Sequence, residues 1–557
     1  MNDKTKNYIR IGILFFLLLL PSFYAMFTAL DLEYSWLKKI AFLVVVIVCL
    51  LIPALFLKAR TYFIVEGIFN FLFCPIDIAS LYLNGQSTSA PFLRNILLTD
   101  RNEALELLAS LWPICVAVVV LWILYFFLAA RVKNEWLLGK KARRVLYIAL
   151  ASLTVFGFVA MLGLQKYMYP TKSTKLLLID AVDSMRSKFY KIYPYNLYLE
   201  LNDLAKMHRE QVQLQKEVSS YRFGIKQQEN LPNALYIVVI GETARYDHLG
   251  LNGYERNTTP LLEQKTHLIS YDSLYTQANL TGYSVPMMLT RATADCQEIS
   301  FKEKSLPEAF QEAGYRAGFI SKQNPSLFTG RVLRECDYAY QFPLTMDVDG
   351  NYDEEIIDKL REYIVDTSQM FVFHTMGSHF RYERRYPQEF AQFQPTLGKN
   401  FSYSMVSKEN KELLVNSYDN SLLYTDYFLS QLIDYMDSLD RPAVMLYLSD
   451  HGESFWDDEN NLSLHGGYLL SEYEYHIPML IWYSDEYERA NPEKVKAIQQ
   501  NKKTPVSTAV IFYSMLDIAN IEDIVDPTRS IASFSLLPMD TIWVQKGTGE
   551  MERMALH

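Results

Sequence analysis

Several side chains that could bind a metal ion or transfer protons directly follow apolar segments of the sequence. The segments and the side chains after them are Leu235–Ile240 with Glu242, Met370–Phe373 with His374 and His379, and Ala443–Leu448 with Asp450 and His451. Carboxylate oxygens combined with imidazole nitrogens are the ligands of a catalytic zinc or manganese ion rather than of calcium. One such residue after one strand is more often part of a turn or a helix cap. Their joint occurrence after three segments predicts a metal site.

A hydroxyl group beside the ion would allow a covalent intermediate. Serine and threonine hydroxyls are weak nucleophiles, and a metal ion can activate them. Thr281 lies in the segment Ala278–Pro286, in which Pro286 predicts the first turn of a helix. Thr281 would then lie at or just before a helix N-terminus, where free backbone amides favour a bound phosphate. Capping of that helix is the alternative role of Thr281.

The apolar segments that position these residues predict an α/β fold. Together with Met479–Trp482 they are near-continuous apolar runs, which are typical of strands buried on both faces of a sheet. Glu308–Gly314 and Glu354–Ile364 fit helices between strands. Ligands of open parallel sheets bind beyond the carboxyl ends of the strands. We therefore expect a catalytic α/β domain over residues 231–545, with its site at one edge of the sheet.

The first 164 residues have a different character. They contain five apolar stretches, at about 11–29, 40–57, 62–83, 107–130 and 145–164. Each is close to the roughly 20 residues that a helix needs to cross a bilayer. A signal peptide would explain only the first of them. We expect a five-span transmembrane domain over residues 1–164.

The distribution of lysine and arginine predicts the orientation of these spans. The basic residues gather at the N-terminus, at Lys58 and Arg60, and in the loop 131–144, which holds six of them. Because basic loops stay in the cytoplasm, the N-terminus is expected inside. Five crossings then place everything after about residue 165 outside the cytoplasm.

Residues 165–230 are expected to form an amphipathic helical connector. Lys175–Lys191 and Leu197–Val218 carry apolar side chains on one side and charges on the other. These helices could lie along the membrane surface or pack on the soluble domain. Cys296 and Cys336 are the two cysteines expected outside the cytoplasm, where they form either one disulfide or two free thiols.

The overall composition excludes several classes of protein. Half of the 557 residues are hydrophobic and 21% are charged, which excludes an intrinsically disordered chain. The formal net charge of −10 argues against a general nucleic-acid-binding protein.

Taken together, the motifs resemble those of the membrane-anchored phosphoethanolamine transferases, within the alkaline phosphatase/sulfatase superfamily. This family includes enzymes that modify lipid A and confer polymyxin resistance. The segments that carry the resemblance are Gly241–Arg245, Asn252–Arg256, Thr281–Pro286, His374–His379, Ser449–Ser454 and Leu464–Gly466. Five spans followed by a periplasmic α/β domain is also the layout of that family, so the resemblance covers nearly the whole chain.

The resemblance implies a set of site residues. The family's zinc ligands fall on Glu242, Thr281, Asp450 and His451, and its nucleophile, which becomes modified by phosphoethanolamine, falls on Thr281. The histidines that bind the substrate phosphate and a second metal ion fall on His379 and His465, so one zinc site is expected and a second is possible. A donor-lipid pattern of the family falls on Asn95, Thr99 and Glu103, although these residues also fit a solvated helix face.

The resemblance also implies the substrates and the compartment. The donor would be phosphatidylethanolamine, and the acceptor a lipopolysaccharide group such as a lipid A phosphate, a core sugar or another glycan. The chain would be a multi-pass protein of the bacterial inner membrane with its catalytic domain in the periplasm.

Two departures from the family pattern leave the acceptor open. Met287 and Met288 stand where the lipid A enzymes have a cysteine, and Asn324–Thr329 replaces a Ser-x-x-Lys phosphate contact. No role for Ser326 or Lys322 is therefore assigned.

Three other functions compete with phosphoethanolamine transfer. A glycerol-phosphate transferase resembling lipoteichoic acid synthase would also have five spans and a threonine nucleophile. A sulfatase would need a Cys or Ser in a signature that ends in arginine, whereas Ser284–Met288 lacks that arginine. A non-catalytic receptor would not need the complete Glu, Thr, Asp and His set.

Three hydroxyls are candidates for the nucleophile. Thr243 follows Glu242, so along a strand its side chain is expected to point the opposite way. Ser284 lacks its arginine partner. We therefore expect Thr281 to be the nucleophile.

Overall fold

The computed structural model describes residues 2–27, 36–84, 88–90, 93, 96, 112–168, 178, 181–182, 193, 195–228, 231–343, 352–398, 405–467 and 469–556. These residues divide into two compact units, one within residues 1–208 and the other within residues 209–557. Each unit has its own hydrophobic core.

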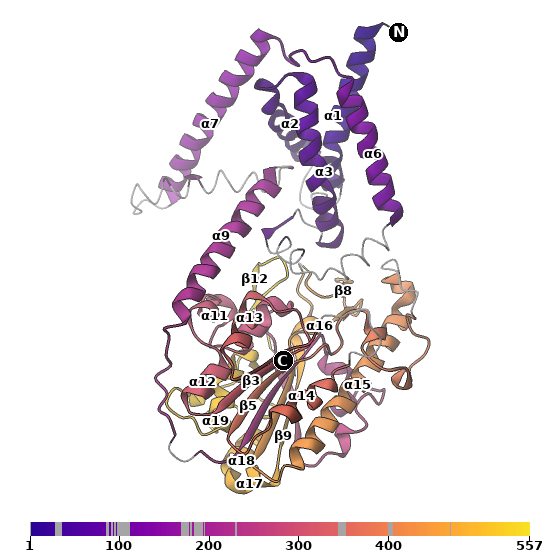
Figure 1. The fold of residues 1–557 in the computed structure, drawn as a ribbon. Coiled ribbons are helices and arrows are strands. Elements are labelled where there is room, and N and C mark those ends of the chain that lie inside the picture. The colour runs from indigo at the N-terminus through magenta and orange to yellow at the C-terminus, as the bar shows by residue number, and fades with distance from the viewer. Residues whose placement is uncertain are drawn as a thin grey trace. The chain divides into compact units, whose positions relative to one another are not determined.

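The first unit is helical. Its helices are α1 (Asp3–Phe27), α2 (Trp36–Leu51), α3 (Ala59–Asn84), α6 (Trp112–Ala130), α7 (Lys140–Met168) and the first part of α9 (Tyr195–Val218) (Figure 1). The core between α1, α2, α3 and α6 is built from side chains such as Leu14, Leu50, Phe63 and Tyr125. Many apolar side chains face outward, as expected of helices surrounded by lipid.

Four stretches of the described chain are long and apolar enough to cross a membrane. They are Asp3–Phe27, Trp36–Leu55, Ala59–Leu81 and Lys140–Leu164. The expected span at 107–130 is represented by α6, but the residues just before Trp112 lie outside the described part of the chain. Four of the five predicted spans are therefore found.

The three basic segments meet at one end of this unit. The Arg10 guanidinium donates to the carbonyl of Arg131 at 3.1 Å, and Arg60 Nε donates to the carbonyl of Val132 at 2.9 Å. The backbone N–H of Ala59 donates to Glu135 O at 2.8 Å. The common location of these segments is what the positive-inside pattern requires.

The helix α9 begins within the first unit. The Tyr195 hydroxyl donates to Cys49 O on α2 at 3.0 Å, and Asn196 Nδ2 donates to Asp77 Oδ1 on α3 at 2.8 Å. The start of the predicted helix 197–218 thus packs on the apolar helices. The other predicted connector helix, 175–191, lies almost entirely outside the described residues.

The second unit is built on an eight-stranded sheet in the order β10-β2-β9-β6-β1-β5-β3-β4. The strands are β1 (Leu235–Gly241), β2 (Leu268–Tyr275), β3 (Arg316–Ser321), β4 (Tyr338–Gln341), β5 (Gln369–His374), β6 (Ala443–Ser449), β9 (His476–Tyr483) and β10 (Val506–Ser507). β1 is parallel to β5 and β6, whereas β9 is antiparallel to both of its neighbours. Two small two-stranded sheets, β7 (Ser454–Phe455) with β8 (Ser463–Leu464) and β11 (Thr541–Gln545) with β12 (Met551–Ala555), complete it.

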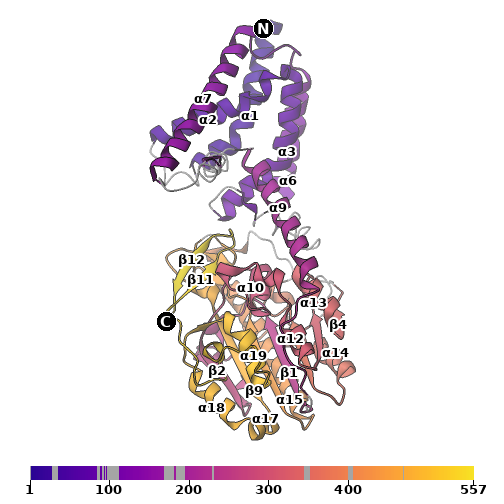
Figure 2. The same ribbon diagram turned by 90° about the vertical axis from the view of Figure 1, so that its left-hand side faces the viewer.

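Helices cover both faces of the large sheet. They are α10 (Thr281–Met288), α11 (Ile299–Lys302), α12 (Leu306–Glu312), α13 (Leu327–Glu335), α14 (Glu355–Tyr363), α15 (Lys411–Asp437), α16 (Glu472–Tyr475), α17 (Asp485–Ala490), α18 (Pro492–Asn501) and α19 (Ile511–Ile518). Figure 2 shows α12 and α19 on one face, and α14 and α15 cover the other. The strand β1 serves both cores, because its alternate residues belong to opposite clusters: Tyr236, Val238 and Ile240 in one, Leu235, Ile237 and Val239 in the other.

The predicted α/β domain with its central strands is therefore present. The segments at 235, 370 and 443 form neighbouring parallel strands, and the two predicted helices correspond to α12 and α14. The second strand of the β11–β12 hairpin lies beyond residue 545, where the domain was expected to end. Cys296 and Cys336 are both free thiols.

Candidate metal and nucleophile site

The register of the sheet brings Glu242 and Asp450 together. Gly241 at the end of β1 pairs with Ser449 at the end of β6, so the next residues of the two strands leave the sheet side by side. Both carboxylates are buried, with exposed fractions of 1% and 0%. The N–H of Thr243 donates to Asp450 Oδ1 at 3.1 Å, which links the two strand ends.

Burial of these two carboxylates acts to raise the pKa of each. Burial and the neighbouring charge of Asp450 hold the pKa of Glu242 well above its usual range. Burial also acts to raise the pKa of Asp450, but His451 and hydrogen bonds from Thr281 and Thr243 lower it below its usual range. Among the described residues, the buried Oδ2 atom of Asp450 has no hydrogen-bond partner. A bound cation would supply the missing partner.

His451 completes the cluster. Its Nδ1 lies 2.9 Å from Gly452 O, so Nδ1 carries the proton and Nε2 offers a lone pair. Nε2 lies 3.4 Å from Asp450 Oδ2 and 3.5 Å from Glu242 Oε1. Burial lowers the pKa of this imidazole, which keeps it neutral as a metal ligand must be.

Thr281 presents its hydroxyl to the same cluster. Its Oγ1 donates to Glu242 Oε2 at 3.3 Å and lies 3.4 Å from His451 Nε2. Thr281 is the first residue of α10, after the extended residue Leu280. The helix thus begins five residues before Pro286, and the prediction that Pro286 starts it was wrong. The N-terminal position of Thr281 is nevertheless found.

The two competing hydroxyls differ in their surroundings. The expectation that Thr243 points away from Glu242 is wrong, because its Oγ1 donates to Glu242 Oε1 at 2.8 Å. The strand alternation ends at Gly241, and the left-handed backbone of Thr243 (φ 61°) turns its side chain back. Ser284 is fully buried within α10, and its Oγ has no hydrogen-bond partner in the described part of the chain.

The donor set fits a zinc ion. Among the described residues, one ligand atom from each of Glu242, Asp450 and His451 lies within 4.8 Å of the others, and all three side chains are buried. Carboxylate oxygens together with an imidazole nitrogen are typical ligands of catalytic zinc sites, and the Thr281 hydroxyl lies beside them. A second such group in the described chain, His267, Asp485 and Glu488, is partly exposed and has both ring nitrogens of its histidine paired with carboxylates.

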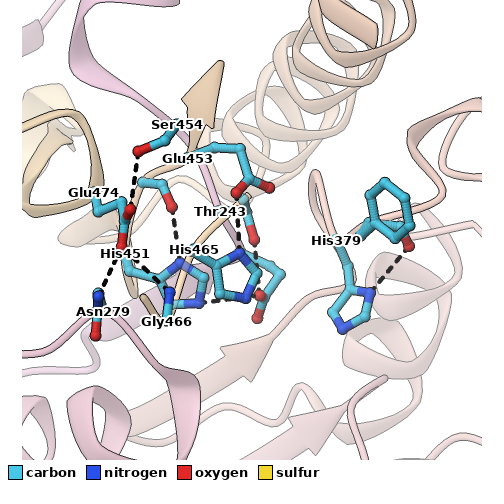
Figure 3. A network of polar contacts seen from close by, with 12 residues as sticks. Thr243, Asn279, His379, His451, Glu453, Ser454, His465, Gly466 and Glu474 are labelled. Atoms are coloured by element: carbon cyan, nitrogen blue, oxygen red, sulfur yellow. Dashed lines mark hydrogen bonds and ion pairs between the residues drawn. The ribbon is translucent and has the colours of Figure 1, made fainter. Parts of the chain in front are cut away.

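His465 lies beside His451. Its ring centroid is 4.1 Å from that of His451, and its Nδ1 lies 3.1 Å from Glu453 Oε1 (Figure 3). Burial acts to lower the pKa of His465, but the charge of Glu453 and its hydrogen bond raise it to about 9. This histidine is therefore a cation at neutral pH.

The histidines that follow β5 are neutral. Burial lowers the pKa of His379 to about 3 and that of His374 to about 4. His379 Nδ1 lies 3.2 Å from Phe380 O, and Figure 3 shows its ring farther from His451 than that of His465. Both ring nitrogens of His374 are buried, and no described residue forms a hydrogen bond with either of them.

Sequence reasoning missed several residues that hold the site. Gln323 Nε2 donates to Glu242 Oε2 and to Thr375 O, both at 3.0 Å. Asp353 accepts the N–H groups of Met376 and Gly377 at 2.9 Å, which fixes the loop before His379. Gln323 follows β3, so the rule that strands end in functional residues could have found it.

Other residues singled out in the sequence lie elsewhere. Asn95, Thr99 and Glu103 are outside the described residues. Ser326 caps α13 by accepting the N–H of Thr329 at 3.1 Å, and Lys322 pairs with Glu355 at 2.7 Å.

Comparisons with known proteins match the catalytic-domain region of the chain to a known family. The family model described as sulfatase matches residues 234–521. The Kdo(2)-lipid A phosphoethanolamine 7''-transferase of Escherichia coli K12 is 31% identical over 293 residues, which are 51% of this chain and 50% of that protein. The phosphoethanolamine transferase EptA of the same strain is 31% identical over 317 residues, 54% of this chain and 56% of that protein. The chain thus matches about half the length of these curated relatives.

Two solved structures share the fold. The integral membrane lipooligosaccharide phosphoethanolamine transferase A of Neisseria meningitidis is similar over 92% of this chain and 97% of its own, with 22% identity and a TM-score of 0.64. The periplasmic domain of Escherichia coli EptC in complex with Zn covers 60% of this chain and 94% of its own, with 24% identity and a TM-score of 0.52. The likeness therefore extends beyond the sheet to the helical first unit.

Proposed function

This chain belongs to the sulfatase family, and from that premise we propose that it is a phosphoethanolamine transferase that uses Thr281 as its nucleophile. The donor is phosphatidylethanolamine and the acceptor a lipopolysaccharide group, either a lipid A phosphate or a core sugar. The observation that carries the proposal is the Thr281 hydroxyl at the start of α10, within hydrogen-bond reach of Glu242 and His451. The relatives named for this activity support it.

We propose Glu242, Thr281, Asp450 and His451 as the ligands of one zinc ion. When bound, zinc supplies a Lewis acid that lowers the pKa of the Thr281 hydroxyl and neutralises charge on the transferred phosphoryl group. The structure of a similar protein with Zn and the orphaned Oδ2 of Asp450 support this assignment.

The first step transfers phosphoethanolamine to the protein. Thr281 Oγ1 forms a bond to the phosphorus of phosphatidylethanolamine, and the bond from phosphorus to the glycerol oxygen breaks. Glu242 Oε2, which accepts a hydrogen bond from Thr281 Oγ1 at 3.3 Å, can take the hydroxyl proton. The protonated His465 faces the negative phosphate and can give a proton to the departing diacylglycerol.

The second step regenerates Thr281. A hydroxyl or phosphate oxygen of the acceptor forms a bond to the phosphorus of the phosphothreonine, and the bond from phosphorus to Oγ1 breaks. Thr281 takes back the proton held by Glu242, and the proton of an attacking hydroxyl passes to His465, which gave its own proton to diacylglycerol in the first step. The start of a helix favours a bound phosphate, and Thr281 is the first residue of α10. His379 is the proposed neutral contact to the substrate phosphate.

We further propose that the helices of residues 1–164, including α6 as a fifth span, anchor the enzyme in the bacterial inner membrane. The connector 165–230 would join them to a periplasmic catalytic domain, and Asn95, Thr99 and Glu103 would contact the donor lipid. Anchoring explains how a water-soluble unit acts on a donor that stays in the bilayer. A phosphatase fusion after residue 230 should be active and one at residue 138 inactive.

Peptide mass spectrometry after incubation with phosphatidylethanolamine tests the proposed reaction. Thr281 should carry an adduct with the mass of a phosphoethanolamine group, whereas a glycerol-phosphate adduct would favour the lipoteichoic-acid-type reaction. Thr281→Ala should abolish transfer with the metal retained, and Thr281→Ser should keep partial activity. An adduct on Thr243 or Ser284 would contradict the assignment. Mass spectrometry of lipid A and core oligosaccharide from cells with and without the gene would identify the acceptor.

A further inference from the structure

The buried carboxylate of Glu474 has no part in the steps above, yet it lies among the loops that carry them. Glu474 belongs to the short helix α16, two residues before β9, and is 1% exposed. Because β9 is antiparallel to β6, its first residues lie at the edge where β1 and β6 end. The strand direction thus brings an acidic side chain to the site from an unexpected part of the sequence.

Three hydrogen bonds converge on this carboxylate (Figure 3). Oε2 accepts from Asn279 Nδ2 at 2.7 Å and from the N–H of Gly466 at 3.2 Å, and Oε1 accepts from Ser454 Oγ at 2.8 Å. Asn279 precedes Thr281 by two residues, and Gly466 directly follows His465. One side chain therefore joins the Thr281 loop (residues 276–281) to the His465 loop (residues 463–467).

The Thr281 loop and the His465 loop also pack directly against each other. A Cβ atom added to Gly466 would lie 2.8 Å from Leu280 Cδ2, so the loops touch directly. The other side-chain polar atom of Asn279, Oδ1, is buried without a partner, which leaves Glu474 as the anchor of that side chain among the described residues. The backbone carbonyl of Glu474 also accepts the N–H of Gly452 at 2.8 Å, beside His451.

The partners of Glu474 require a group that accepts hydrogen bonds. Two of them are N–H groups that can only donate, and the described chain offers no ion pair to this carboxylate. Burial raises the pKa of Glu474 to about 7. Burying a carboxylate costs free energy. The hydrogen bonds of Glu474 join two loops, which gives this buried group a structural task at the site.

We propose that Glu474 is a positioning residue that holds the Thr281 loop and the His465 loop in their reactive arrangement. The catalytic roles of these loops rest on the proposed function. The consequence is kinetic: without the carboxylate, Thr281 and His465 lose their common anchor, and a displacement of about 1 Å can cost roughly 10²-fold in rate.

A comparison of three variants in the full-length, zinc-loaded protein tests this proposal. Glu474→Ala should lower kcat for transfer about 10²-fold with little change in KM for phosphatidylethanolamine. Glu474→Gln should stay near wild type, because its oxygen can accept from Asn279 and Gly466 while its amide donates to the Ser454 hydroxyl. Rescue by the amide would show that the hydrogen bonds, rather than the charge, carry the effect.

Asp426→Ala is the matched control. Asp426 is also 1% exposed, and its carboxylate accepts the N–H groups of Leu261 and Leu262 at 3.0 and 2.8 Å, away from the site. This variant should lose comparable thermal stability and keep its kcat at a temperature where both proteins are folded. If Asp426→Ala loses as much rate as Glu474→Ala, Glu474 has only a structural role and the proposal is wrong.

Hydrogen exchange gives a second test that does not need the transferase activity. In Glu474→Ala, the amides of residues 279–284 and 463–467 should exchange faster, while those of β1 and β6 stay protected. Glu474→Gln and Asp426→Ala should leave both loops unchanged. Unaltered exchange in Glu474→Ala would overturn the proposal. A wild-type protein without transfer activity would instead contradict the proposed function, and the exchange result would still decide on Glu474.

Discussion

The ring centroids of His451 and His465 lie 4.1 Å apart. Their surroundings nevertheless keep His451 neutral and His465 protonated. His451 shares its Nδ1 proton with a neutral carbonyl, Gly452 O, and burial lowers its pKa. The corresponding nitrogen of His465 faces the carboxylate of Glu453, which raises its pKa to about 9. The two partners are consecutive residues of one turn.

The difference separates the site into two halves with different tasks. The metal half (Glu242, Asp450 and His451) combines two buried carboxyl groups with a neutral imidazole, which suits a bound cation. The His465 half (Glu453, His465 and Glu474) already contains its own positive charge. A phosphate between the halves would thus meet a cation on each side.

The largest expected effect comes from breaking the metal half. Asp450→Ala and His451→Ala should each lose zinc and lower transfer about 10³-fold or more, because the proposed zinc ion would both activate Thr281 and neutralise the phosphate. Metal analysis of the purified variants checks this, with Asp426→Ala as a folded control. Stoichiometric zinc in the double variant would show that these residues are not the ligands.

Replacing His465 should remove its positive charge and leave the bound zinc in place. His465→Asn removes the cation that faces the phosphate, and we expect transfer to fall about 10²-fold, within the range of general acid catalysis. Zinc content should match that of wild type. If His465→Asn loses zinc as Asp450→Ala does, the two halves are one metal site and the comparison fails.

Much of the metal half could be predicted from the sequence. Glu242, Asp450 and His451 follow apolar strands, and parallel strands end at a common edge, so local pattern and one topological rule suffice. Thr281 was found from its position before a helix, although the helix starts earlier than Pro286 indicates. Thr243 was misjudged because strand alternation does not continue past Gly241.

The His465 half was harder to predict because it depends on strand direction. Met479–Trp482 gives the same apolar pattern whether its strand is parallel or antiparallel. Only the antiparallel direction of β9 brings Glu474 to the edge where the parallel strands end. The pairing of His465 with Glu453 across a tight loop likewise leaves no periodic signal in the sequence.

A smaller effect is expected from the hairpin that supports His465. A Cβ atom at Gly547, in the turn between β11 and β12, would lie 1.8 Å from Gly466 O, so Gly547→Ala must displace one of the two backbones. We expect kcat to fall about tenfold, because His465 moves while the zinc ligands do not. Gly467→Ala is the matched control, since its Cβ would meet only Leu462 Cδ2 at 3.9 Å. Equal activity of the two variants would show that the β11–β12 hairpin does not position His465.

The smallest effect concerns the pH dependence of stability in protein freed of zinc by a chelator. The folded pKa of His465, about 9, lies above the ordinary value of 6.5, so the folded state favours its charged form. Its contribution is fully present below pH 6.5 and is lost as the pH rises through 9, at most about 3 kcal/mol of unfolding free energy. The melting temperature of wild type should therefore fall by several degrees between pH 6.5 and 9.5, while His465→Asn should show a flatter curve. His451→Asn should keep the slope of wild type, because His451 is neutral over this range. Parallel curves for wild type and His465→Asn would mean that Glu453 does not hold His465 as a cation, and the contrast between the two histidines would disappear.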